Sequence, residues 1–271
     1  MKVLLTITLI VGHFGPVALF GQSLRYPVSL PYLNLCAFSK QQQDPFSFTA
    51  NQAALAGEKQ KSIGLFSERR FMLAATSAYR LVADWPSSMG NFGLQIDYAG
   101  FRNFNENKIG LAYARNLGAG LAVGIQFNYY GYRIPAYGSA STLNVEAGAI
   151  IHFTDQLNGG FHIYNPMGSR LGKSPGEKLA SSYSMGLGYD ASPDFFVGAE
   201  LVKEEDRPVN VIAGVQYHFE KIFFARMGIE SETGAVYAGT GVGWRDLRLD
   251  LSASYHPQLG FSPGILMVIR F

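Results

Sequence analysis

Apolar and polar side chains alternate along most of this chain, in stretches of roughly ten residues. In the stretch Asn91 to Phe101, for example, Leu94 and Ile96 fall on one face while Gln95 and Asp97 fall on the other. Because successive side chains of a β-strand point to opposite faces, this period of two predicts strands whose faces meet different environments. The same alternation continues in Gly120 to Tyr130, Asn144 to Thr154, Val209 to Phe219 and Leu247 to Tyr255.

Turn-forming residues separate the alternating stretches and divide the region from Ile63 onward into about fourteen predicted strands. The count is open by about two, because the region Ser67 to Ala83 fits no single pattern. The turns are expected at Asn103 to Asn107, Ala136 to Ala140, Gly168 to Glu177, Glu204 to Pro208 and His256 to Pro263.

Each predicted strand has a long apolar face and an opposite face of Gly, Ser, Asn, Gln and scattered charges. Backbone polar groups in lipid must all be hydrogen-bonded, so strands that face lipid must close into a barrel. The pattern therefore predicts an all-β protein, a transmembrane antiparallel β-barrel over residues 62–271 with a hydrated lumen. An exported, soluble β-sandwich is the alternative, but it would carry a more strongly charged polar face.

The composition agrees with a wall between lipid and water. Charged residues make up 15% of the chain, against a usual share of about 25%. Aromatic residues make up 14%, and there are 31 glycines. The net charge is +2, and no run of Lys and Arg could follow a phosphate backbone, so nucleic acid is not an expected partner.

The first residues are typical of a secretory signal peptide, predicted over residues 1–21. Lys2 supplies the positive start, an apolar stretch runs from Val3 to Val11, and Gly21 precedes the expected cleavage point. The segment is too short and too interrupted to span a membrane as a helix. A buried N-terminal strand or helix is the alternative. Cys36 is the single cysteine, which excludes a disulfide within the chain.

The last strand carries a second targeting signal. Ile265, Met267, Ile269 and Phe271 fall on one face, and the sequence ends in an aromatic residue. This pattern resembles the C-terminal strand of bacterial outer-membrane proteins. The resemblance implies recognition by the barrel-assembly machinery, contact with outer-membrane lipid, and a location in the bacterial outer membrane.

Residues 22–61 do not alternate, and we expect them to form a periplasmic segment or a hatch that folds into the lumen. Asn51 can cap a short helix through Ala56, with Gly57 as its stop. The candidate hatch residues are Asp44, Pro45, Asn51, Gln52, Ala53 and Leu55.

The stretch Asn51 to Ala56 resembles the Asn-Pro-Ala-x-Leu-Ala element of FadL-like barrels, including the PorV and PorQ proteins of Bacteroidota. Gln52 stands where that element has proline. The resemblance implies about fourteen strands with an N-terminal hatch. It also implies transport of hydrophobic or small solutes, or service as an accessory barrel of type IX-like protein secretion, with secretion components as partners.

The inward faces carry charges of both signs, which predicts ion-pair networks that brace the lumen. Because an ion-selective pore usually has one dominant sign, this balance argues against a wide, selective channel. The candidate lumen network comprises Asp97, Glu146, His152, Glu200, Arg226, Arg248, Asp250 and Arg270.

Two groups of polar residues invite a catalytic or metal-binding interpretation. A lipid hydrolase would need a serine and a histidine in contact, and His256 lies near Ser252, Ser254 and Asp250. His152, Glu146 and His162 offer possible metal ligands. Any polar strand face presents such residues, so we predict no catalytic residues, no metal and no cofactor. A lipid hydrolase and a purely structural outer-membrane protein remain the alternatives to a transporter or an accessory barrel.

Overall fold

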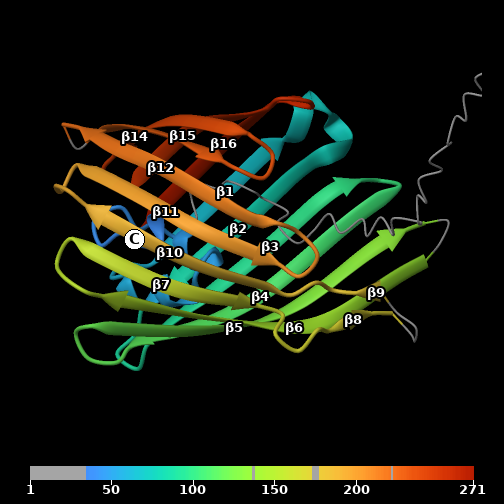
Figure 1. The fold of residues 1–271 in the computed structure, drawn as a ribbon, viewed down its shortest axis with the longest axis horizontal. Helices are drawn as coiled ribbons and strands as arrows, with labels where there is room; N and C mark the ends of the chain where they lie inside the picture. The colour runs from blue at the N-terminus through green and yellow to red at the C-terminus, as the bar shows by residue number, and fades with distance from the viewer. Residues whose placement is uncertain (1–34, 136–137, 173–176, 221) are drawn as a thin grey trace, which may run out of the picture.

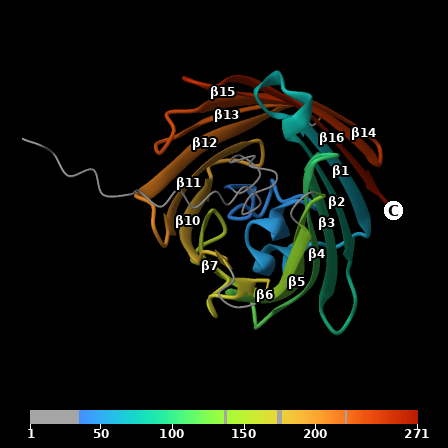
Figure 2. The same cartoon turned by 90° about the vertical axis from the view of Figure 1, so that its right-hand side faces the viewer.

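The computed structural model describes residues 35–135, 138–172, 177–220 and 222–271. The predicted signal peptide, residues 1–21, lies outside the described residues. The described part of the chain forms a closed barrel of 14 antiparallel strands, so the predicted fold class is confirmed. Figures 1 and 2 show the barrel from two directions. The barrel closes where β1 pairs with β16, with Ser62 opposite Arg270.

The barrel strands follow one another around the wall in chain order, except that β7 pairs with β10. Their bounds are β1 Ser62–Arg69, β2 Ser77–Trp85, β3 Asn91–Phe101, β4 Phe104–Asn116, β5 Leu121–Ile134, β6 Gly138–His152, β7 Leu157–Tyr164, β10 Ser182–Asp190, β11 Phe195–Glu204, β12 Val209–Phe219, β13 Phe223–Glu230, β14 Val236–Trp244, β15 Leu247–His256 and β16 Gly260–Arg270. The short strands β8 (Arg170–Leu171) and β9 (Glu177–Lys178) pair with each other outside the barrel sheet.

The two faces of the strands match the predicted alternation. On β3, Phe92, Ile96 and Tyr98 are exposed on the outer surface, while Gln95 and Asp97 are buried inside. The same parity holds around the barrel, so the outer surface is apolar and the interior is largely polar. An apolar outer face is what a membrane-spanning barrel requires. None of the helices in the described residues is long and apolar enough to cross a membrane.

Three predicted turns are shorter than expected, and one of them is Ala136 to Ala140, since β6 begins at Gly138. β4 begins at Phe104 and pairs with Phe101, so only residues 102–103 form the turn predicted over Asn103 to Asn107. β16 likewise begins at Gly260, inside the predicted turn His256 to Pro263. The polar residues that suggested these turns lie at strand ends. Strand ends extend beyond the apolar core of the membrane, so polar side chains are tolerated there.

The ambiguous region Ser67 to Ala83 contains the ends of β1 and β2 and two short 3₁₀-helices, η3 (Arg70–Met72) and η4 (Ala74–Thr76). Phe71 and Met72 have φ angles of 53° and 60°. Left-handed backbone is unfavourable for residues with a Cβ, and this departure from regular structure explains why the region fits no strand pattern.

Residues 35–58, here called the plug segment, lie inside the barrel (blue in Figure 2). The segment contains the 3₁₀-helices η1 (Ser47–Thr49) and η2 (Gln52–Gly57). It lies at the barrel end where short connections, such as residues 245–246 and 191–194, join the strands. The long connection that carries β8 and β9 lies at the opposite end.

The plug segment has one aromatic and one small-residue side. Phe46, Phe48 and Leu55 pack in one buried cluster with Phe66 of β1 and Val82 of β2. On the other side, alanines of the plug segment pack against the wall formed by β5 and β6; these are Ala37, Ala50, Ala53 and Ala54, in contact with Ala122 and Ile150. These two clusters join the plug segment to the inner wall, while another buried cluster, of Tyr130, Tyr164, Leu171 and Leu179, contains no buried residue of the plug segment.

Candidate functional site

Asn51 fixes the conformation of η2 and its place in the barrel at the same time. Its side-chain oxygen accepts a hydrogen bond from the Ala53 N–H at 3.1 Å, which is the N-cap that the sequence predicts. Its side-chain amide donates to the carbonyl oxygens of Ala149 and Phe161, at 3.3 and 3.0 Å. One buried side chain thus connects the start of the helix to β6 and β7.

Inward-facing glycines leave the space that the plug segment occupies. A Cβ atom on Gly124 would meet the backbone of Gln52, and one on Gly148 would meet the side chain of Asn51. Nine glycines of the inner wall approach the plug segment in this way: Gly64, Gly93, Gly124, Gly148, Gly160, Gly186, Gly188, Gly198 and Gly214. We call this set the glycine belt. It shows that the inner wall is shaped to the plug segment.

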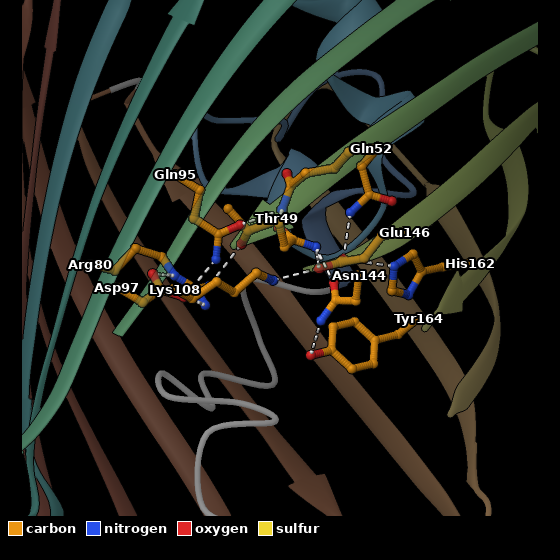
Figure 3. Close-up of polar contacts among 12 residues, drawn as sticks. Thr49, Gln52, Arg80, Gln95, Asp97, Lys108, Asn144, Glu146, His162 and Tyr164 are labelled. Carbon is orange, nitrogen blue, oxygen red and sulfur yellow. Dashed lines mark hydrogen bonds and ion pairs between the residues drawn. The ribbon is translucent and has the colours of Figure 1, made fainter. Parts of the chain in front are cut away.

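A buried set of hydrogen bonds and ion pairs, here called the first cluster, joins the plug segment to the wall from β2 to β7 (Figure 3). Arg80 on β2 forms a two-armed ion pair with Asp97 on β3, at 2.7 and 2.9 Å. The same guanidinium donates to the Thr49 hydroxyl of η1 at 2.8 Å. Gln95 donates to Asp97 at 2.6 Å and accepts from Gln126 of β5 at 3.0 Å, which carries the network along the wall.

Glu146 on β6 is the centre of the other half of this network (Figure 3). Lys108 of β4 donates to it at 2.5 Å, and His162 of β7 lies 3.1 Å away. Asn128 donates to it at 2.8 Å, and the Gln52 amide of the plug segment donates at 2.8 Å. A buried carboxylate is stable when it is paired and hydrogen-bonded in this way. Moving Gln52 would therefore disturb a carboxylate that four side chains share.

A second cluster, made of ion pairs around Arg248, holds the plug segment to the opposite wall. Arg248 of β15 donates to Asp44 of the plug segment at 2.9 Å and to Asp250 at 2.6 Å. Arg226 of β13 donates to Asp250 at 2.5 Å. Asp44 also accepts from the Phe46 N–H at 2.9 Å, which stabilises the turn before η1.

Near this second cluster, the plug segment and the wall enclose a space of about 10 Å³ beside Cys36 and Gln216, room for one water molecule. The Cys36 thiol donates weakly to Gln216 at 3.6 Å. Burial, with the nearby negative charge of Asp44, raises the pKa of Cys36 to about 12. The thiol therefore stays protonated and unreactive at neutral pH.

A third contact lies at the rim of the barrel. The Ser39 hydroxyl and the Lys40 N–H of the plug segment donate to Asp190 at the end of β10, at 2.5 and 2.9 Å. Asn158 of β7 donates to the same carboxylate at 3.4 Å and lies 2.6 Å from His152.

The structure places all of the candidate hatch residues in the plug segment and all of the candidate lumen residues on inward faces. It does not join the lumen residues into one network. Asp97 and Glu146 belong to the first cluster, Arg226, Arg248 and Asp250 to the second, and His152 to the rim contact. Glu200 is buried on β11, and Arg270 is half-buried beside Glu58 and Asp84. The C-terminal residues Ile265, Met267, Ile269 and Phe271 face outward on or directly after β16.

The sequence analysis missed several members of the first cluster. Arg80 lies in the region Ser67 to Ala83, which fits no single strand pattern. Lys108 directly follows the turn predicted over Asn103 to Asn107, which is longer than the observed turn. Gln95, Gln126 and Asn128 are uncharged and were treated only as polar lining. The alternation itself could have found them. Counting in steps of two along each strand, with the register between strands, places these residues on the same inner face as Asp97 and Glu146.

The structure does not assemble the hydrolase candidates. Asp250 is engaged by Arg226 and Arg248, and the His256 ring nitrogen accepts from the N–H groups of Gln258 and Leu259 in the following turn. The metal candidates are separated too: His162 contacts Glu146, but His152 contacts Asn158. Among the described residues, no group of three or more His, Cys, Asp or Glu side chains is arranged to hold a metal ion.

No known protein-family pattern and no curated protein sequence matches this chain. Solved structures do match its fold. The toluene transporter TodX of P. putida superposes with a TM-score of 0.63 at 9% identity, over 84% of this chain and 94% of TodX. The toluene transporter TbuX of Ralstonia pickettii gives 0.61 at 10%, over 86% and 95%. A FadL homologue of Pseudomonas aeruginosa gives 0.58 at 12%, over 87% and 94%.

These similarities define the fold as that of FadL-type outer-membrane β-barrels. The protein thus has the fold of outer-membrane barrels, with a segment of its own chain inside the lumen. Short turns lie on the periplasmic side in barrels of this class, so the end that holds the plug segment is the periplasmic end.

Proposed function

We propose that this protein is a FadL-like channel that passes a small solute through its lumen when the plug segment moves. The observation that carries the proposal is that residues 35–58 fill the lumen, and that Gln52, Thr49 and Asp44 attach them to the wall through hydrogen bonds and an ion pair between side chains. Such contacts can be broken and remade without unfolding the barrel wall. The fold supports the proposal, since TodX and TbuX are toluene transporters.

The inner wall behind the plug segment indicates a solute with an apolar body and a polar group. Phe66, Val82, Leu266 and Val268 form an apolar strip on β16, β1 and β2, covered by the aromatic side of the plug segment. The polar side chains of the first cluster line the wall from β2 to β7. Movement of the plug segment would open a passage with one apolar and one polar side, suited to small amphipathic molecules.

Reconstitution tests this proposal. We expect the mature chain to take up small aromatic solutes into proteoliposomes, and to show brief conductance events in planar bilayers. The Asp44→Asn variant removes the ionic attraction to Arg248 and should lengthen those events. Folding of each sample is checked by its heat-dependent migration in SDS gels. The proposal would be contradicted if both proteins are correctly folded but show no uptake and no conductance.

A second candidate is a closed barrel that docks a partner, such as an accessory component of type IX-like secretion. The observation that favours it is the fit between the plug segment and the glycine belt, because a wall shaped to its plug suits permanent closure. The resemblance of Asn51 to Ala56 to PorV and PorQ points the same way and stays a prediction, as does an origin in Bacteroidota. Co-purification of a specific periplasmic or membrane protein, with no conductance in any variant, would favour this candidate.

A further inference from the structure

The periplasmic rim carries a row of outward-facing residues across the seam where the barrel closes. Ser62 pairs with Asp84 of β2 and with Arg270 of β16, so the preceding Lys61 lies level with Trp85 on one side and Phe271 on the other. The Phe271 N–H donates to the Lys61 carbonyl oxygen at 2.9 Å, which continues this register.

The Lys61 cation lies in the middle of this aromatic row on the lipid-facing rim. Trp85 and Phe271 expose 59% and 70% of their surface, and Phe92 of β3 extends the row beside Trp85. The Lys61 ammonium lies 3.9 Å from the centre of the Trp85 ring, within the range of a cation–π interaction. This contact holds the charge at the membrane surface while leaving ammonium N–H groups free to donate.

A groove lies directly beside this row. Its volume is about 360 Å³, and it is lined by Lys59, Gln60, Lys61, Pro86 and Phe271. Neither lysine forms an ion pair with another described residue. The groove therefore combines two cations with aromatic surface at the level where aromatic residues meet lipid headgroups in barrels of this type.

We propose that this groove binds the headgroup phosphate of a phospholipid from the periplasmic leaflet of the outer membrane. Lys59 and Lys61 would donate to the phosphate oxygens, and Trp85 and Phe271 would contact the glycerol and the start of the acyl chains. Charge complementarity and the outward direction of the row favour a lipid over an acidic protein segment, because a protein would approach from the periplasm and not from the bilayer. This site is independent of transport, since it lies on the outside of the barrel.

Native mass spectrometry of the delipidated mature chain tests the proposal by titration with phosphatidylglycerol. We expect one tightly bound phospholipid per barrel, and an affinity about tenfold lower in the Lys59→Gln/Lys61→Gln double variant, since the loss of about 1.4 kcal/mol changes a binding constant by that factor. Lys61→Arg should keep most of the affinity. Arg115→Gln is the matched control, because Arg115 also faces outward near the same rim but does not line the groove.

Three results would overturn the proposal. The first is equal affinity for phosphatidylglycerol in the parent and the double variant, with both folded by heat-dependent gel migration. The second is an equal loss in Arg115→Gln, which would show that general rim charge and not the groove binds lipid. The third is equal binding of diacylglycerol, which has no phosphate.

Discussion

Asp44 in the plug segment and Arg248 on β15 form an ion pair at 2.9 Å, although they are 204 positions apart in the chain. The Asp44 side chain is nearly fully buried, and Asp250 shares the same guanidinium at 2.6 Å. This pair connects the beginning of the described chain to the next-to-last barrel strand. It is one of several polar attachments that keep the plug segment in the lumen, among them those to Glu146, Arg80 and Asp190.

The first prediction concerns the strength of this attachment. Asp44→Asn keeps an oxygen that can accept from the Phe46 N–H but removes the charge that faces Arg248. Weakening a buried, charge-assisted hydrogen bond should lower the free energy of unfolding by about 1–3 kcal/mol. Asp155→Asn is the matched control, because the Lys40–Asp155 pair is exposed at the rim, where water and salt screen it, and its loss should change the free energy of unfolding far less. Denaturant unfolding followed by tryptophan fluorescence measures both, and equal effects would contradict the prediction.

The glycine belt gives a second prediction. A methyl group added by Gly124→Ala would meet the backbone of Gln52, so either the plug segment or β5 must shift. Overpacking of this kind should cost about 1–3 kcal/mol and should increase conductance if the plug segment yields. Gly131→Ala on the same strand places its methyl group at ordinary contact distance and should have little effect. Equal free energies of unfolding and equal conductance in the two variants would show that the glycine belt does not determine how the plug segment fits the wall.

The third prediction concerns the position where this chain departs from the FadL-like element. Gln52 is the first residue of η2, a position that accepts proline because its N–H has no partner within the helix. Gln52→Pro should therefore keep the conformation of the plug segment and lose only the bond to Glu146, which retains Lys108, His162 and Asn128. We expect a loss of roughly 0.5–1.5 kcal/mol. A loss as large as that of Asn51→Pro, which destroys the cap, would contradict this.

The fourth prediction is a pH dependence of plug retention. Burial, with the nearby charge of Asp44, raises the pKa of the Glu58 carboxyl group from 4.5 to about 7. Arg270 and Arg248 oppose this rise, and Asp84 of β2 faces the same group. Because the plugged state binds this proton more tightly than water-exposed Glu58 does, the plugged state is most stable below about pH 4.5 and loses stability as the pH rises from there to about 7.

The open probability in bilayers should therefore increase between about pH 4.5 and about pH 7 and change little above that. Glu58→Gln cannot ionise and should flatten this part of the profile. If the variant keeps the pH dependence of the parent chain, another group is responsible.

The sequence predicted the barrel well because lipid imposes a simple rule on every strand. Leu94 and Ile96 must face out, and Gln95 and Asp97 must therefore face in, whatever the neighbouring strands are. The partners of those inward residues were not predictable. That Asp97 meets Arg80 depends on the register of β2 against β3, and β2 begins after an irregular region that contains Phe71 and Met72.

The plug segment was only partly predictable from the sequence. The cap at Asn51 is a local feature and was visible. The contacts of Asp44 with Arg248 and of Gln52 with Glu146 join positions 204 and 94 residues apart, and no short-range pattern records them. The alternating pattern places glycines on the inner face but does not indicate what occupies the space beside them. Only the structure shows that the space at Gly124 and Gly148 is filled by the plug segment.

The central claim, that solute passes only when the plug segment moves, is tested most directly by tethering that segment. A Cβ atom on Gly148 would meet the side chain of Asn51, so Asn51→Cys/Gly148→Cys, made together with Cys36→Ser, places two thiols within reach of a disulfide. The measurement is single-channel conductance of this variant before and after reduction. The account predicts a silent oxidised barrel that conducts once a reductant is added. Equal conductance in the two states, with the disulfide confirmed by mass spectrometry, would contradict it.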